Sequence, residues 1–177
     1  IARVRQADGP GYERVAAAAH EAFLKWRMLP APTRGERVRA RGVPAWQITT
    51  GGACHLEAKM LAKIFPQIPE DLDLLFIENV GNLVCPAEFR VGDDRKVMVL
   101  SVTEGEDKPL KYPHMFRAAD AMVLSKADLL PHLEFDLERC VEYARRVNPR
   151  LKLFKLSATR GTGLDSWYEW LRRRGAS

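Results

Sequence analysis

The sequence predicts an α/β fold in which helices flank a parallel sheet. Short apolar runs with the composition of buried strands alternate with segments whose apolar residues recur at helical spacing. This alternation is typical of right-handed β-α-β units, whose strands run parallel. One run, residues 74–77, is followed closely by an acid, a glycine and a thiol, namely Glu78, Gly81 and Cys85. Because ligands of open α/β sheets bind at the carboxyl ends of the strands, we expect these three residues at the ligand-binding edge.

The first part of the chain predicts one strand and one helix. Residues 1–7 alternate apolar and polar side chains, which indicates a strand, and a turn rich in glycine follows at 8–11. Apolar residues then recur at helical spacing over about 12–28, and Pro30 and Pro32 end that pattern.

The next segment predicts a brief strand and a helix that carries two candidate ligands. The strand covers Ala45 to Thr49. A capping residue and a glycine pair, Thr50 to Gly52, precede an apolar series with helical spacing that extends from Leu56 to Ile64. We therefore expect Cys54 and His55 in the first turn of this helix.

Three further apolar runs predict strands, at residues 96–103, 118–124 and 151–156. Apolar residues at i, i+3, i+4 and i+7 from Leu137 to Ala144 predict a helix that turns Cys140 toward the core. A last helix is expected over 164–171.

Composition favours one soluble domain, since 177 residues with 46% hydrophobic and 29% charged side chains are ordinary for a globular protein. No apolar run approaches the roughly 18 residues of a membrane span, and the first 30 residues show no signal-peptide pattern. We expect a cytoplasmic protein without membrane contact. The cysteines, Cys54, Cys85 and Cys140, are too few for a disulfide framework, which leaves free thiols or metal ligands.

The net charge of +5 comes entirely from the N-terminal part. Residues 1–41 hold nine Lys and Arg against four Asp and Glu, whereas the remainder holds nineteen of each. The basic segment has no interleaved aromatic residues for stacking on bases and matches no nucleic-acid motif. We read it as a solvated helical face and expect no nucleic-acid partner.

Two thiols and an imidazole are candidate metal ligands. Cys54, His55 and Cys85 offer soft sulfur and nitrogen donors, which suit zinc or nickel better than magnesium. A cysteine in the first turn of a helix also has its pKa lowered by the helix N-terminus. Three protein ligands leave a position open for exchange. The alternative is a strand and loop with a buried cysteine and no metal.

A second candidate site follows the run at 118–124. The carboxylate of Asp128 is able to accept two parallel hydrogen bonds from the ring N–H and the amine of guanine, which adenine does not offer. Lys126 would lie along the base, and the backbone amide of Ala158, within Ser157-Ala-Thr159, would donate to the guanine carbonyl. The alternative is a solvated loop.

Five sequence words carry a family resemblance over about 135 residues. They are Gly42-Val-Pro44, Thr50-Gly-Gly-Ala-Cys-His-Leu-Glu57, Leu74 to Phe89, Leu100 to Asp120, and Ser125-Lys-Ala-Asp128. Through them the chain from Arg41 onward resembles the hydrogenase nickel-incorporation GTPases, the HypB family. The resemblance implies a phosphate-loop GTPase fold of the SIMIBI type.

The resemblance also implies roles and partners. Cys54, His55 and Cys85 would bind nickel or zinc at the interface of a homodimer. Ser125, Lys126 and Asp128 would read the guanine of GTP, with Ser157 and Ala158 behind them, and Glu78 to Gly81 would sense magnesium and the γ-phosphate. Other hydrogenase maturation factors and the hydrogenase large subunit would be the partners.

The sequence departs from that family in two respects. No glycine in it is followed by lysine, so these residues hold no phosphate loop of the form G-x-x-x-x-G-K-[ST] and no first strand leading into one. Ser125 stands where the family usually has asparagine. We therefore expect impaired GTP binding and hydrolysis.

Residues 1–36 resemble another family, the N-terminal segment of aldehyde dehydrogenases, in Ala17-Ala-Ala-His-Glu-Ala-Phe23 and Pro30-Ala-Pro-Thr-Arg-Gly-Glu36. We expect a chimera of this segment with a G domain over 37–177 that is truncated at its N-terminus. The leading hypothesis is a metal-binding GTPase-family protein of hydrogenase maturation. A metal-binding or dimerising module without nucleotide turnover is the alternative, and an aldehyde oxidoreductase is a third with no catalytic residue to support it.

Overall fold

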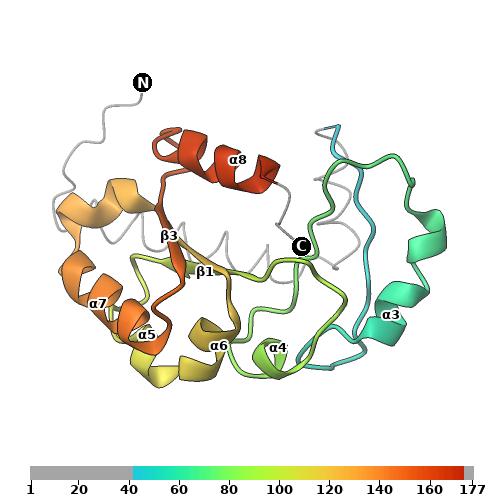
Figure 1. Cartoon of the computed structure of the whole chain (residues 1–177), viewed down its shortest axis with the longest axis horizontal. Coiled ribbons are helices and arrows are strands. Elements are labelled where there is room, and N and C mark those ends of the chain that lie inside the picture. The colour runs from blue at the N-terminus through green and yellow to red at the C-terminus, as the bar shows by residue number, and fades with distance from the viewer. Residues whose placement is uncertain (1–41, 174–177) are drawn as a thin grey trace, which may run out of the picture. The chain divides into compact units, whose positions relative to one another are not determined.

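The computed structural model describes residues 42–173 (Figure 1). The chain divides into two units, residues 1–49 and 50–177, and the second holds the candidate site residues together with every helix and strand that the structure describes. The strand expected at 1–7 and the helix expected over about 12–28 lie outside the described residues.

Three parallel strands form the sheet. They are β1 (Val97–Ser101), β2 (Ala121–Ser125) and β3 (Lys152–Lys155), in the order β1-β2-β3. Val99 lies opposite Val123, and Met122 lies opposite Leu153. The three later strands and their parallel arrangement were predicted from the apolar runs, and both predictions are confirmed. Parallel pairing follows because each strand is joined to the next through helices.

Short helices surround the sheet. The α-helices of the described part are α3 (Ala58–Ala62), α4 (Cys85–Glu88), α5 (Lys108–Lys111), α6 (Pro113–Ala118), α7 (Leu137–Val147) and α8 (Leu164–Arg172). Two 3₁₀ turns, η1 (Phe65–Gln67) and η2 (Ala127–His132), complete them. The helices expected over 137–144 and 164–171 are confirmed as α7 and α8. Within residues 42–173, no helix combines the length and the hydropathy that a membrane span requires.

The two faces of the sheet pack against different helices. Strand residues alternate between the faces, and one face joins α6 and α7 in a core whose fully buried members include Phe116 and Cys140. On the other face Phe154 contacts Trp167 and Trp170 of α8, with ring centroids 5.3 and 5.6 Å away. Figure 1 shows α8 on the opposite side of the sheet from α7.

Two residues fix the ends of these helices. The side-chain amide of Asn148, at the C-cap of α7, donates to the carbonyl oxygens of Phe116 and Ala119 at 3.0 Å each, so it satisfies buried carbonyls at the end of α6. Gly163 caps the start of α8 at a φ of +77°, where a Cβ would collide with the carbonyl oxygen of Lys155. Only glycine fits this turn from β3 into α8.

Three expectations were wrong. No strand forms at 45–49 or at 74–77. A strand requires a neighbour for its backbone hydrogen bonds, and residues 74–77 pair with none of the described strands. The side chain of Phe76 is 66% exposed as a result. Helix α3 begins at Ala58 with Glu57 as its N-cap, so Cys54 and His55 precede it and do not lie in its first turn.

We predict that alkaline pH destabilises the fold through Cys140. Burial raises the pKa of its thiol to about 11, helped by the charge of Glu106. In the unfolded chain the thiol ionises near pH 8.5. Between these values the folded state holds the extra proton, so the free energy of unfolding falls as the pH rises. The gap in unfolding free energy between the wild type and Cys140→Ala should shrink by about 2.5 kcal/mol between pH 8.5 and 11.

Denaturant unfolding of both proteins across this pH range measures that gap. Taking the difference cancels the lysine and tyrosine titrations that both proteins share. A gap that stays constant to pH 11 would mean that the Cys140 thiol ionises as freely in the folded chain as in the unfolded one.

Candidate metal centre and nucleotide edge

Cys54, His55 and Cys85 come together although the two cysteines are 31 residues apart in the chain. One ligand atom from each lies within 4.8 Å of the others. Cys54 and His55 belong to the loop before α3, and Cys85 is the first residue of α4. Cys54 is exposed and the other two are half-buried, which leaves the cluster open to an incoming ion.

The pKa of Cys54 is raised, in contrast to the expected lowering. Its thiol donates a hydrogen bond to the sulfur of Cys85 at 2.8 Å, and this bond, with smaller contributions from desolvation and from the charge of Cys85, favours the protonated form. The expectation of a lowered pKa relied on a helix N-terminus at Cys54, which the start of α3 at Ala58 rules out. The Cys54 thiol therefore keeps its proton and donates it in a hydrogen bond to the sulfur of Cys85.

The three residues fit a soft divalent metal. Their donors are two thiols and an imidazole, and Sγ of Cys54 lies 3.6 Å from Nδ1 of His55. Two ligand atoms bound to one zinc ion at about 2.0–2.3 Å are separated by roughly 3–4 Å. Small side-chain movements and the loss of the thiol protons would therefore let the cluster hold one ion, with a coordination position left open.

The loop that carries Cys85 is anchored to the core. Pro86 is buried, and Leu83 and Ala87 pack against the core cluster beneath the sheet. Lys96, just before β1, donates from its Nζ to the carbonyl oxygen of Pro86 at 2.7 Å. Helix α4 also packs against α6. The position of Cys85 is therefore fixed by contacts of α4 with the hydrophobic core, with α6 and with Lys96 next to β1.

The loop with Cys54 and His55 is held by residues that the sequence analysis missed. The side-chain oxygen of Asn79 accepts from the backbone amide of Leu56 at 2.8 Å, and Leu56 is itself buried. The ring of Phe89 stacks on His55 with centroids 4.3 Å apart and an angle of 10° between the planes. The sequence did contain a signal for this role, because Asn79 and Asn82 lie close to Gly81 and to the candidate ligand Cys85. Asparagine side chains often form hydrogen bonds with loop backbones.

The predicted guanine-reading residues also lie together, at the carboxyl ends of β2 and β3. The amide of Ala127 donates to the carbonyl oxygen of Leu156 at 3.1 Å, which joins the two segments. The pKa of the Asp128 carboxyl is lowered, first by a hydrogen bond from Ser157, then by a backbone hydrogen bond and the charge of Arg160. Asp128 is therefore a carboxylate near neutral pH, and a hydrogen-bond acceptor.

The other members of this edge differ in exposure. Ser125 is half-buried and its hydroxyl donates to the carbonyl oxygen of Leu100 at 3.3 Å, inside the sheet. Lys126 is exposed and has a φ of +59°, a left-handed conformation that costs a non-glycine residue roughly 1 kcal/mol. Strained backbone of this kind is concentrated at binding sites. Ser157 is fully buried, and Ala158 after it is exposed.

Glu78 and Gly81 are exposed in the loop that leads to Cys85, and neither belongs to the cluster of ligand atoms. A Cβ added to Gly81 would meet nothing within 4 Å. Packing within the described residues therefore gives no reason for glycine at this position.

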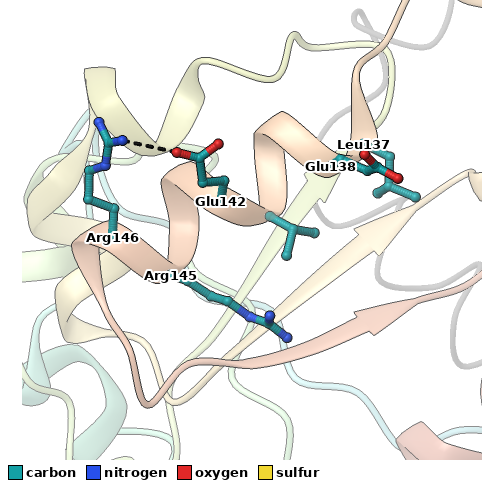
Figure 2. Close-up of a pocket in the computed structure, with 6 residues that line it drawn as sticks. Leu137, Glu138, Glu142, Arg145 and Arg146 are labelled. Carbon is teal, nitrogen blue, oxygen red and sulfur yellow. Dashed lines mark hydrogen bonds and ion pairs between the residues drawn. The ribbon is translucent and has the colours of Figure 1, made fainter.

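A shallow hollow elsewhere on the surface is unrelated to these residues. Figure 2 shows that it lies along the exposed side of α7, where Arg146 pairs with Glu142 at 3.0 Å. All of its lining residues come from that one helix, and no candidate ligand or base-reading residue is among them.

Comparisons with known proteins give a consistent result. The family model for the CobW/HypB/UreG nucleotide-binding domain matches residues 32–155. The hydrogenase maturation factor HypB of Azotobacter chroococcum is 62% identical over 143 residues, which are 79% of this chain and 47% of that protein. The HypB of Escherichia coli is 60% identical over 136 residues, 76% of this chain and 47% of that protein.

A solved structure is similar as well. The crystal structure of HypB from Helicobacter pylori in complex with nickel matches with a TM-score of 0.74 and 42% identity, over 77% of this chain and 66% of that one. The chain spans about half the length of the curated relatives that it matches. A family model that covers most of the chain and relatives at 60% identity lead to one conclusion: the chain belongs to the HypB family of hydrogenase maturation factors, within the CobW/HypB/UreG nucleotide-binding proteins.

Proposed function

We propose that this chain binds nickel or zinc through Cys54, His55 and Cys85 and serves in the insertion of nickel into a hydrogenase. The observation that carries the proposal is the convergence of three soft donors within 4.8 Å from two separate loops. The relatives are named hydrogenase maturation factors, and one solved neighbour holds nickel. The ion would be cargo rather than a resident cofactor.

The chemistry of such a site is capture and release. The thiols must lose their protons before they bind the ion, so binding releases protons. The Cys54–Cys85 hydrogen bond is the contact that the ion replaces. Exposure of Cys54 and an open coordination position let an acceptor reach the ion, which is what a metallochaperone requires.

A guanine nucleotide is the second proposed ligand. The ionised Asp128 would accept hydrogen bonds from guanine, Lys126 would lie along the base, and Ser125, Ser157 and the amide of Ala158 would line the same edge. Glu78 and Gly81 would sense magnesium and the γ-phosphate from the loop that also carries Cys85. These 177 residues hold no Walker A lysine, so we propose that they bind and hydrolyse GTP poorly by themselves.

The proposed setting follows from the site and the family. Free thiols at an exposed metal cluster suit a reducing compartment such as the cytoplasm. Homodimerisation through the metal-site edge, and contact with other maturation factors and a hydrogenase large subunit, are the proposed interactions. Nucleic acid and membrane are not proposed as partners.

An alternative function includes metal binding but no nucleotide turnover. In this alternative the chain is a metal-binding, dimerising module without nucleotide turnover. The cluster of Cys54, His55 and Cys85 supports this alternative as well as it supports the first proposal.

We further propose that residues 1–36 are an aldehyde-dehydrogenase-like segment joined to a HypB-like domain over 37–177. The family match begins at residue 32, close to this proposed join.

We predict that nickel or zinc binds this chain at one ion per one or two protomers. Replacing Cys54, His55 or Cys85 by alanine should weaken binding at least about tenfold, because each change removes a donor. Isothermal titration of the reduced protein measures affinity and stoichiometry together. Cys140→Ala is the matched control, because that thiol is fully buried in the core and should leave both values unchanged. Binding that survives Cys85→Ala but disappears in Cys140→Ala would overturn the ligand assignment.

We also predict that GDP and GTP bind this 177-residue chain far more weakly than they bind a full-length family member. Several charge-assisted hydrogen bonds to phosphate, at roughly 1.5–3 kcal/mol each, have no donors here. A deficit of about 6 kcal/mol, or roughly 10⁴-fold in Kd, is expected. Fluorescent guanine nucleotides, with the adenine analogue as control, give the measurement. GTP turnover that persists in the purified chain and vanishes in Asp128→Ala would contradict it.

A further inference from the structure

Asn82 contacts both halves of the candidate metal centre. Its Nδ2 lies 3.5 Å from Sγ of Cys85 and 3.4 Å from the carbonyl oxygen of Cys54. One side chain therefore touches two segments that are otherwise distant in the sequence. Neither sequence motifs nor ligand spacing identified this residue.

The orientation of the Asn82 amide is fixed by a third contact. Its Oδ1 lies 2.8 Å from the backbone nitrogen of Val84. Because a backbone N–H only donates, the atom facing Val84 must be the oxygen, and the NH₂ group is left to face the sulfur and the carbonyl. The side chain is half-buried, so solvent competes only partly for these contacts.

We propose that Asn82 is a positioning residue of the metal centre, which donates an N–H···S hydrogen bond to the Cys85 thiolate and sets how strongly that sulfur donates to the metal. The inference rests on the proposed metal-binding function. A hydrogen bond draws electron density from a thiolate, and such outer contacts commonly change metal affinity by about 10- to 100-fold. The same group's contact with the Cys54 carbonyl holds the second ligand loop in register.

Asn79, in the same loop, offers a matched control. Its Oδ1 accepts from the backbone amides of Leu56 and Val80 at 2.8 Å each. Its hydrogen bonds within residues 42–173 thus join backbone segments, whereas those of Asn82 also reach a sulfur. Loss of Asn79 should loosen the site without changing the electron density on Cys85.

The test uses nickel(II) chloride as the probe of the whole reduced chain. Wild type should show a thiolate-to-nickel charge-transfer band in the near ultraviolet. Asn82→Ala removes the N–H donor to Cys85, so the thiolate regains electron density and the band should move to longer wavelength. The same change frees the Cys54 loop, so affinity should fall by about 10- to 100-fold. Asn82→Asp keeps an oxygen for the Val84 amide but cannot donate when ionised, so its band should move in the same direction. Asn79→Ala should weaken binding and leave the band in place.

The outcomes separate this inference from the function it rests on. A wild-type chain that binds no nickel, or binds it without a thiolate band, contradicts the proposed binding of nickel through the two cysteines. Normal binding in the wild type with an unmoved band in both Asn82 variants overturns the donor role alone. A band that moves equally in Asn79→Ala would show that loosening of the loop, and not the hydrogen bond to sulfur, shifts it. Far-ultraviolet circular dichroism confirms that each variant is folded.

Discussion

The buried face of the three-stranded sheet is the constraint on which the rest of the described structure depends. Phe116 of α6 and Cys140 of α7 are fully buried against it, and burying one side chain of the size of Phe116 contributes about 1.5–3 kcal/mol. The parallel register that this packing fixes brings the carboxyl ends of β2 and β3 to one edge, where Asp128 meets Ser157. The same core also supports α4, because Ala87 of this helix packs against it, and α4 carries Cys85.

The candidate metal centre is built differently from the hydrophobic core. Its helices have four or five residues. Its loops are joined by a hydrogen bond that Asn79 accepts from Leu56, by one that Asn82 donates to Cys54, and by the stacking of His55 on Phe89. Each such bond contributes only about 1 kcal/mol to stability. A site with a firm base at Cys85 and a weakly tethered loop at Cys54 is able to open for an ion without disturbing the sheet.

The loop between Glu78 and Cys85 connects the two proposed ligands. Its first part carries the residues proposed to respond to magnesium and phosphate, and its last residue, Cys85, is a proposed metal donor. A change of loop conformation at Gly81 would move Asn82 and, through it, Cys85 and Cys54. Coupling between two binding sites is reciprocal. Any factor by which a bound nucleotide changes the metal affinity is therefore also the factor by which the metal changes the nucleotide affinity.

The sequence by itself determined the later strands, α7, α8 and the burial of Cys140, because apolar periodicity reports which face of an element meets a core. It also supplied the identities of Cys54, His55 and Cys85, since donor type is a property of the side chain. Tertiary structure alone decided the rest. Residues 74–77 have the composition of a strand but pair with none of the described strands, and pairing is not encoded in one segment. The raised pKa of Cys54 and the roles of Asn79 and Asn82 arise from contacts between loops distant in the chain, which local pattern does not record.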